Sequence, residues 1–186
     1  MEEIESINIL IVDDRPENLL VLESVLENMN CNIIKAISGN EALSLMLDYK
    51  FALVLLDVQM PEMDGFETAE LMRSNSRTKY IPIIFVTAIS KEQRCIFKGY
   101  EVGAVDYLFK PIEPVILQSK VRVFIELYSQ KLLVEEQSML LKLRVKELTE
   151  LRANNDILEN LSIKDSLTGI PNRRHFDNYL ETSFNG

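Results

Sequence analysis

The chain has 186 residues, of which 47% are hydrophobic and 26% charged, and its net charge is −9. This length exceeds a typical domain of about 100–150 residues but is short for two, so it predicts one compact core with an appendage. The hydrophobic fraction argues against a disordered chain. A negative charge without a dense cluster of Lys and Arg argues against nucleic acid as a partner.

The cysteines and the N-terminus indicate the cellular compartment. Cys31 and Cys95 stand far apart in the sequence and fit neither a disulfide framework nor a metal-ligand spacing. The stretch from Met1 to Glu5 is acidic where a signal peptide would be basic, and no apolar run approaches the ~20 residues of a membrane span. We therefore expect reduced, buried thiols in a cytoplasmic segment that does not enter a membrane.

Five short apolar runs alternate with longer amphipathic stretches, which is the pattern of repeated βα units. The runs at 53–56 and 83–86 are apolar on consecutive residues, so helices should cover both faces of these strands, as in a parallel sheet. The pattern predicts an α/β fold, doubly wound around a five-stranded parallel sheet. The expected strands are Ile7–Val12, Asn32–Ala36, Phe51–Leu56, Pro82–Val86 and Asp106–Phe109.

Capping residues mark the starts of the expected helices. The first helix begins near Pro16, because proline suits an early helical position. Ser38 stands three residues before Glu41, and Ser90 three before Gln93, so each pair could satisfy two backbone N–H groups reciprocally. The two capped helices are expected at Gly39–Leu47 and Lys91–Val102.

A long helix is expected in the C-terminal part of the chain. After Pro114 neither Gly nor Pro occurs until Gly169, and one helix over about 113–161 would extend about 70 Å at ~1.5 Å per residue. Its apolar positions form an imperfect heptad pattern, because Arg152 and Asn155 fall on seam positions. A solitary exposed stalk and a paired coiled coil are the alternatives. The length favours the pair, since long helices need tertiary partners.

Side chains that carry chemistry stand where the expected strands end. In an open parallel sheet all strand C-termini lie along one edge, and ligands bind at that edge. Carboxylates that converge there would repel one another without a cation, and ligation by oxygen alone favours Mg²⁺. These residues are Asp13 and Asp14 after the first strand, Asp57 at the end of the third, Thr87 at the end of the fourth and Lys110 at the end of the fifth.

A cation of this kind also binds phosphate oxygens, so Asp57 becomes a candidate nucleophile towards phosphorus. Lys110 could neutralise charge beside it, and the Thr87 hydroxyl could donate a hydrogen bond to a transferred phosphoryl oxygen. Each residue also has a purely structural explanation: Asp14 could cap a helix, Thr87 suits a strand, and Lys110 could be a solvated loop residue. Asp57 is harder to explain that way, because an acid directly after a buried strand is costly without a partner. The five residues together favour a site.

Four stretches resemble the response-regulator receiver family, and the resemblance extends over about residues 6–128. It implies a flavodoxin-like fold with Asp57 as the phosphoacceptor, a sensor histidine kinase or phosphotransfer protein as the donor, and Lys110 on the acyl phosphate. The stretches are Ile9–Asp14, Leu55–Gly65, Val86–Ala88 and Asp106–Pro111.

The same resemblance implies a metal site and a switch. Mg²⁺ would be bound by the carboxylates of Asp13, Asp14 and Asp57 and by the backbone carbonyl of Gln59. Thr87 and Tyr107 would be the switch pair: the hydroxyl moves towards the phosphoryl group, and the aromatic ring follows into the vacated space. Gly65 fits the family's turn after the phosphorylation loop, where a positive φ is expected.

The segment Asp165–Phe176 resembles the opening of the GGDEF family, the diguanylate cyclases, over about residues 161–184. That family's residues for GTP and metal come later, and no Gly-Gly-Asp/Glu-Glu-Phe segment stands in this chain. The resemblance implies a parent protein that makes cyclic di-GMP from GTP. The expected domains are a receiver at 1–128, a helical coiled-coil linker at 129–161 and the truncated start of a GGDEF domain at 162–186.

The prediction is therefore a phosphorylation-controlled receiver that forms a homodimer through its own surface and the stalk helix, and so controls a cyclase. One alternative is a receiver scaffold that acts only by phosphorylation-dependent protein–protein interaction. Another is a phosphatase of the haloacid-dehalogenase type. Such an enzyme requires a second carboxylate two residues after its aspartate nucleophile. Gln59 occupies that position here, which argues against a phosphatase of this type.

Overall fold

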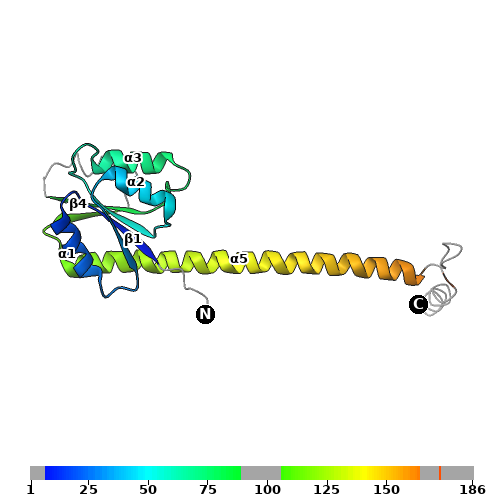
Figure 1. Ribbon diagram of the computed structural model, residues 1–186. Coiled ribbons are helices and arrows are strands. Elements are labelled where there is room, and N and C mark those ends of the chain that lie inside the picture. Colours follow the sequence, from blue (N-terminus) through cyan, green and yellow to red (C-terminus); the bar gives the residue numbers. More distant parts are fainter. Residues whose placement is uncertain (1–6, 89–105, 164–171, 173–186) are drawn as a thin grey trace. The chain divides into compact units, whose positions relative to one another are not determined.

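The computed structural model describes residues 7–88, 106–163 and 172, and the chain divides into two compact units, Met1–Leu132 and Leu133–Gly186. The first unit is built on a five-stranded parallel sheet with the order β2-β1-β3-β4-β5 (Figure 1). This strand order is flavodoxin-like and confirms the predicted doubly wound α/β fold. The strands are β1 (Asn8–Val12), β2 (Asn32–Ala36), β3 (Leu53–Asp57), β4 (Ile83–Ala88) and β5 (Asp106–Lys110).

Four helices accompany the sheet in the described part of the chain. The first, second and last were predicted close to their observed bounds. The alternation of strands and helices predicted a helix between β3 and β4, but not its bounds. The predicted helix Lys91–Val102 lies outside the described residues. The observed helices are α1 (Pro16–Leu26), α2 (Gly39–Asp48), α3 (Gly65–Ser74) and α5 (Pro114–Ile163).

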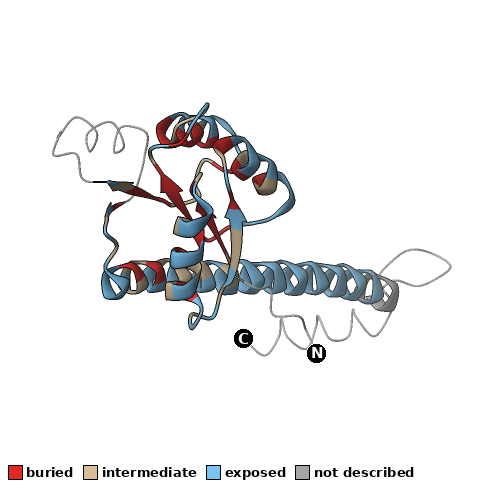
Figure 2. Ribbon diagram, turned by 60° about the vertical axis from the view of Figure 1, so that its left-hand side comes forward, coloured by how far each residue is buried: buried red, intermediate tan, exposed pale blue. Residues whose placement is uncertain are grey.

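The core consists of two apolar layers, one on each face of the sheet, because alternate residues of a strand point to opposite faces. On one face, Leu56 and Phe85 pack with buried side chains of α2 and α3. On the other face, Leu55 packs with buried side chains of α1 and with Leu117 and Val121 of α5, both fully buried. Figure 2 shows the buried residues concentrated in the strands and on the sheet-facing sides of these helices. The two layers fix the strand ends that form the candidate site.

The second unit contains the later turns of α5. Every residue from 133 to 158 is exposed, including Leu141, Leu148 and Leu158 at 64%, 57% and 62%. Such a row of exposed aliphatic side chains is unusual on a chain that acts alone. Among the described residues, no helix has the uninterrupted apolar length that a membrane crossing needs.

The sulfhydryl of Cys31 is free and half-buried. Burial raises the pKa of this thiol, which keeps it protonated and slow to react. Cys95, the other predicted thiol, lies outside the described residues.

The helix starts use side-chain caps, with one difference from expectation. Ser38 accepts a hydrogen bond from the Glu41 amide, but the Glu41 carboxylate accepts from the Ile37 amide, one residue before the serine. At α3, Asp64 and Glu67 form a complete capping box. The N-cap of α1 is Arg15, without a side-chain cap. Asp14 is therefore not the cap of that helix.

Asp64→Ala is expected to lower the free energy of unfolding by about 1 kcal/mol, because it leaves the Glu67 amide without its acceptor. Urea denaturation followed by circular dichroism measures the change. Glu70→Ala, at an exposed position of the same helix, is the control and should shift the midpoint much less. Equal shifts for the two variants would contradict the capping role.

Candidate functional site

Three carboxylates meet at the carboxyl edge of the sheet. Asp57 is the last residue of β3 and is 5% exposed. Asp13 and Asp14 follow β1, the first fully buried and the second half-buried. One oxygen from each of the three lies within 4.8 Å of the others. The structure thus brings together the three carboxylates that the sequence predicted at the strand ends.

Lys110 lies against two of these carboxylates. It is the last residue of β5, and pairing of β4 with β5 aligns it with Ala88. Its Nζ is 2.8 Å from Oδ2 of Asp13 and 3.1 Å from Oδ1 of Asp57. The peptide bond from Lys110 to Pro111 is cis. A single lysine therefore bridges two acids that come from different strands.

The cluster is electrostatically unequal. Burial raises the pKa of Asp57, the Lys110 ammonium lowers it in part, and the nearby Asp13 carboxylate raises it again, so the net shift is upward. For Lys110, burial alone would lower the pKa, but the contacts with Asp13 and Asp57 outweigh burial and the net shift is upward. Lys110 therefore stays protonated and positively charged. Ionisation of Asp57 is energetically unfavourable in this site, and a second cation beside it would make ionisation easier.

Asp13 accepts further hydrogen bonds that the sequence did not predict. The Asn18 side-chain amide lies 2.8 and 2.9 Å from the two carboxylate oxygens, and the Arg15 backbone amide donates to Oδ1 at 3.0 Å. These donors come from the start of α1 and hold the Asp13 carboxylate in place. The sequence does contain a signal for these contacts: Asn18 stands in the first turn of the helix that follows Asp13 and Asp14.

Thr87 and Tyr107 lie on the neighbouring strands β4 and β5: Thr87 is near the carboxyl end of β4, and Tyr107 pairs with Phe85, two residues before Thr87. Thr87 is half-exposed, and its hydroxyl donates to the Ala88 carbonyl at 3.1 Å. Tyr107 is 7% exposed, and its ring centroid is 5.5 Å from that of Phe85, which in turn lies 4.9 Å from that of Phe66. The tyrosine ring is therefore packed inward, against the core. The coupled movement of the pair stays a prediction.

The loop between β3 and α3 follows Asp57. Gln59 is exposed there, two residues after the aspartate. The positive φ lies at Glu62, at 65°, and not at Gly65 as the resemblance led us to expect. The Gly65 amide donates to the Val58 carbonyl at 3.0 Å, and a Cβ at Gly65 would collide with the carbonyl oxygen of Asp57. Glycine is required for close approach to the Asp57 backbone, not for its own dihedral angle.

The donor set fits a hard divalent cation. Asp13, Asp14 and Asp57 supply oxygen ligands alone, and ions such as Mg²⁺ prefer them over nitrogen or sulfur. The raised pKa of Asp57 points the same way, because burial, together with the nearby Asp13 carboxylate, outweighs the opposing effect of Lys110. The cluster can thus hold a cation beside a buried carboxylate whose oxygen could act as a nucleophile.

Comparison with known proteins identifies relatives for most of the first unit. Residues 9–122 match the family described as the response regulator receiver domain. A Vibrio cholerae protein named "Probable cyclic di-GMP phosphodiesterase" is 40% identical over 126 residues, which are 68% of this chain and 28% of that protein. The transcriptional regulatory protein SrrA of Staphylococcus aureus is 40% identical over 114 residues, 60% of this chain and 46% of that one. The chain therefore spans less than half the length of these curated relatives.

Solved structures agree with these relatives. The chemotaxis response regulator CheY4 of Vibrio cholerae has a TM-score of 0.59 at 28% identity, covering 64% of this chain and 98% of that one. A two-component response regulator from Clostridium difficile has a TM-score of 0.59 at 29% identity, covering 65% and 97%. In both cases the similarity spans nearly the whole of the other protein and about two thirds of this chain.

Proposed function

The chain belongs to the response regulator receiver domain family, and we propose that its Asp57 accepts a phosphoryl group from a sensor histidine kinase or phosphotransfer protein. The observation that carries the proposal is the Lys110 ammonium, 2.8 Å from Asp13 and 3.1 Å from Asp57 within one cluster of carboxylates. An oxygen of Asp57 bonds to phosphorus as the bond from phosphorus to the donor breaks, which leaves an acyl phosphate. Lys110 then balances charge on the transferred oxygens.

The proposal assigns a Mg²⁺ site to Asp13, Asp14, Asp57 and the backbone carbonyl of Gln59. When bound, the ion would neutralise the carboxylates and orient phosphate oxygens. Asn18 supports this assignment, because its contacts with both oxygens of Asp13 hold that ligand in a fixed orientation.

Phosphoryl uptake is expected to require the divalent cation. Incubation with a small phosphodonor such as acetyl phosphate and Mg²⁺ should add the mass of one phosphoryl group, and EDTA should abolish the gain. Intact-mass spectrometry measures both. Restoring Mg²⁺ in excess over EDTA should restore the gain, which controls for damage by the chelator. Uptake that is equal with and without Mg²⁺ would contradict the metal assignment.

The proposed switch joins the site to the α5 side of the domain. A phosphoryl group adds nearly two negative charges and strong acceptor oxygens, which Thr87 and Lys110 would satisfy in one arrangement. If the Thr87 hydroxyl leaves the Ala88 carbonyl for the phosphoryl group, Tyr107 follows it. Supporting the proposal, Tyr107 lies on β5, next to the strand that carries Thr87, and its ring packs on Phe85.

The proposed domains are a receiver at 1–128, a coiled-coil linker at 129–161 and the start of a GGDEF domain at 162–186. Exposed aliphatic residues of α5 support a stalk that pairs with a second copy. The relative named for a cyclic di-GMP phosphodiesterase supports an output concerned with this nucleotide, although its name describes breakdown and not synthesis. Membership of the receiver family supports a cytoplasmic location.

The output is tested on the longer gene product. Incubation of that protein with GTP and Mg²⁺, after treatment with beryllofluoride, is expected to form cyclic di-GMP, measured by liquid chromatography. The present chain is expected to form none, because it lacks the GGDEF residues. Absence of product from the longer protein would instead favour the scaffold alternative, in which phosphorylation acts only through protein–protein interaction.

A further inference from the structure

A hollow lies at the opposite edge of the sheet from the carboxylate cluster around Asp57. It has a volume of about 470 Å³ and is lined by residues that immediately precede β3 and β4, by the end of α3 and the chain after it, and by α5. This volume falls within the range of small-molecule sites, roughly 300–1,000 Å³. All of its lining residues belong to the first unit. Nothing in the proposed phosphoryl chemistry uses it.

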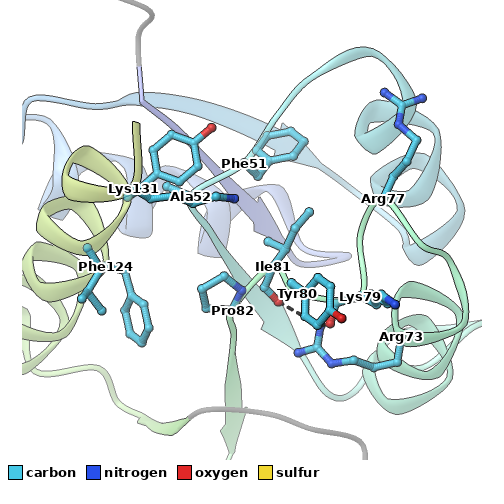
Figure 3. Close-up of a pocket in the computed structure, with 12 residues that line it drawn as sticks. Phe51, Ala52, Arg73, Arg77, Lys79, Tyr80, Ile81, Pro82, Phe124 and Lys131 are labelled. Carbon is cyan, nitrogen blue, oxygen red and sulfur yellow. Dashed lines mark hydrogen bonds between the residues drawn. The ribbon is translucent and has the colours of Figure 1, made fainter. Parts of the chain in front are cut away.

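Cations surround this hollow in a chain whose net charge is −9. Arg73, Arg77, Lys79 and Lys131 line it, and no lining residue in the described part of the chain carries a carboxylate. The Arg73 guanidinium is held by the carbonyl oxygens of Lys79 and Ile81, each at 2.9 Å. Figure 3 shows Arg73, Lys79 and Tyr80 on one side of the hollow and Phe124 and Lys131 of α5 on the other. The hollow is therefore suited to a negatively charged ligand.

Aromatic rings accompany the cations. Phe51, Tyr80, Phe124 and Tyr128 line the same hollow. Tyr80 is 82% exposed, and the Lys79 ammonium lies 4.7 Å from its ring centroid. An exposed aromatic ring next to a cation can stack on a planar base while the cation binds phosphate oxygens. A purely aliphatic ligand would use neither feature.

From these contacts we infer that the hollow formed by Arg73, Lys79, Tyr80, Phe124 and Lys131 binds a nucleotide. The base stacks on the aromatic rings, and the phosphate groups lie among the ammonium and guanidinium groups. A bound nucleotide would contact the chain before β4 and the α5 helix together, so it would join the sheet to the helix that leaves the domain. This site is independent of phosphorylation at Asp57.

Isothermal titration calorimetry with ATP tests the inference. EDTA is included, so that no divalent cation carries ATP to the acidic cluster at the other edge. ATP is expected to bind with a dissociation constant below about 1 mM, and adenosine or tripolyphosphate alone at least tenfold more weakly. Lys79→Glu should weaken ATP binding at least tenfold, and Tyr80→Ala should weaken ATP but leave the weak binding of tripolyphosphate unchanged.

Lys142→Glu, at an exposed position of the second unit, makes the same charge change away from the hollow and should leave ATP binding unchanged. Circular dichroism and phosphoryl uptake should match the wild type for every variant, since Tyr80 is exposed and Lys79 is only half-buried. Failure of ATP to bind, equal binding of tripolyphosphate and ATP, or unchanged binding by Lys79→Glu would each overturn the nucleotide site.

Discussion

Asp57→Asn is expected to abolish phosphoryl uptake from small phosphodonors in the presence of Mg²⁺. Asparagine keeps the shape of the side chain but removes the anionic oxygen that would bond to phosphorus. Asp13 is not expected to replace it, because Asn18, the Arg15 amide and Lys110 already hold its carboxylate. Intact-mass spectrometry should find no added phosphoryl group on the variant.

Asp48→Asn is the matched control for this experiment. Asp48 is an exposed carboxylate at the end of α2, so the same substitution there should leave uptake at the wild-type level. A phosphoryl group gained by Asp57→Asn to the same extent as the wild type would show that the nucleophile is another residue.

Loss of uptake by Asp57→Asn should not reflect unfolding. The pKa of Asp57 is raised in the folded protein, by burial first and by Asp13 next, with Lys110 opposing the shift. A raised carboxyl pKa means that ionised Asp57 costs stability above the usual carboxyl pKa, and that this cost grows as the pH rises through the folded value. Asparagine removes the charge. The metal-free variant should therefore unfold in urea at neutral pH at a midpoint no lower than that of the wild type.

Leu148→Lys is expected to dissociate a dimer formed through the stalk. Leu148 is 57% exposed in the described chain, and pairing of two helices would bury it in both copies. Full burial of an aliphatic side chain contributes about 1.5–3 kcal/mol. Replacing both copies by charged lysine should therefore weaken self-association more than tenfold. Sedimentation equilibrium measures the dissociation constant with and without beryllofluoride.

Thr149→Lys supplies the control, because it adds the same charge one residue along the helix, about 100° away around its axis. Thr149 is exposed as well, and this variant should stay dimeric. Arg152 and Asn155 interrupt the apolar seam, so the paired stalk should tolerate more than one register. A wild-type chain that stays monomeric at high micromolar concentration, with and without beryllofluoride, would disprove the dimerising stalk.

The sheet and most of the candidate site could be predicted because their signals are local in sequence. In runs such as Leu53 to Leu56 every residue is apolar. This pattern is typical of a strand that is covered on both faces. Once the strands are known, parallel topology alone brings Asp13, Asp57 and Lys110 to one edge. The apolar runs gave the strand ends only approximately, however: β3 extends to Asp57 and β4 to Ala88.

Other features depend on tertiary contacts that no spacing in the sequence reveals. Asn18 looks like an ordinary polar residue of a helical first turn until Asp13 is placed beside it. Gly65 looks like a turn glycine, whereas its requirement comes from the Asp57 carbonyl. Helix α3 is a different case, because the spacing of Asp64 and Glu67 in the sequence is itself a capping-box signal for the start of that helix.

The packing of α5 limits how a signal can be transmitted mechanically. Leu117 and Val121 are fully buried in the same apolar layer as Leu55 and Val86. Lifting the helix from the sheet would expose each of these side chains, at about 1.5–3 kcal/mol apiece, and would uncover the strands beneath them. Because α5 completes the core, we do not expect it to dissociate from the sheet during signalling. We therefore expect the first turns of α5 to stay packed on the sheet, and a signal to be transmitted by rotation of the helix about its axis or by translation along it.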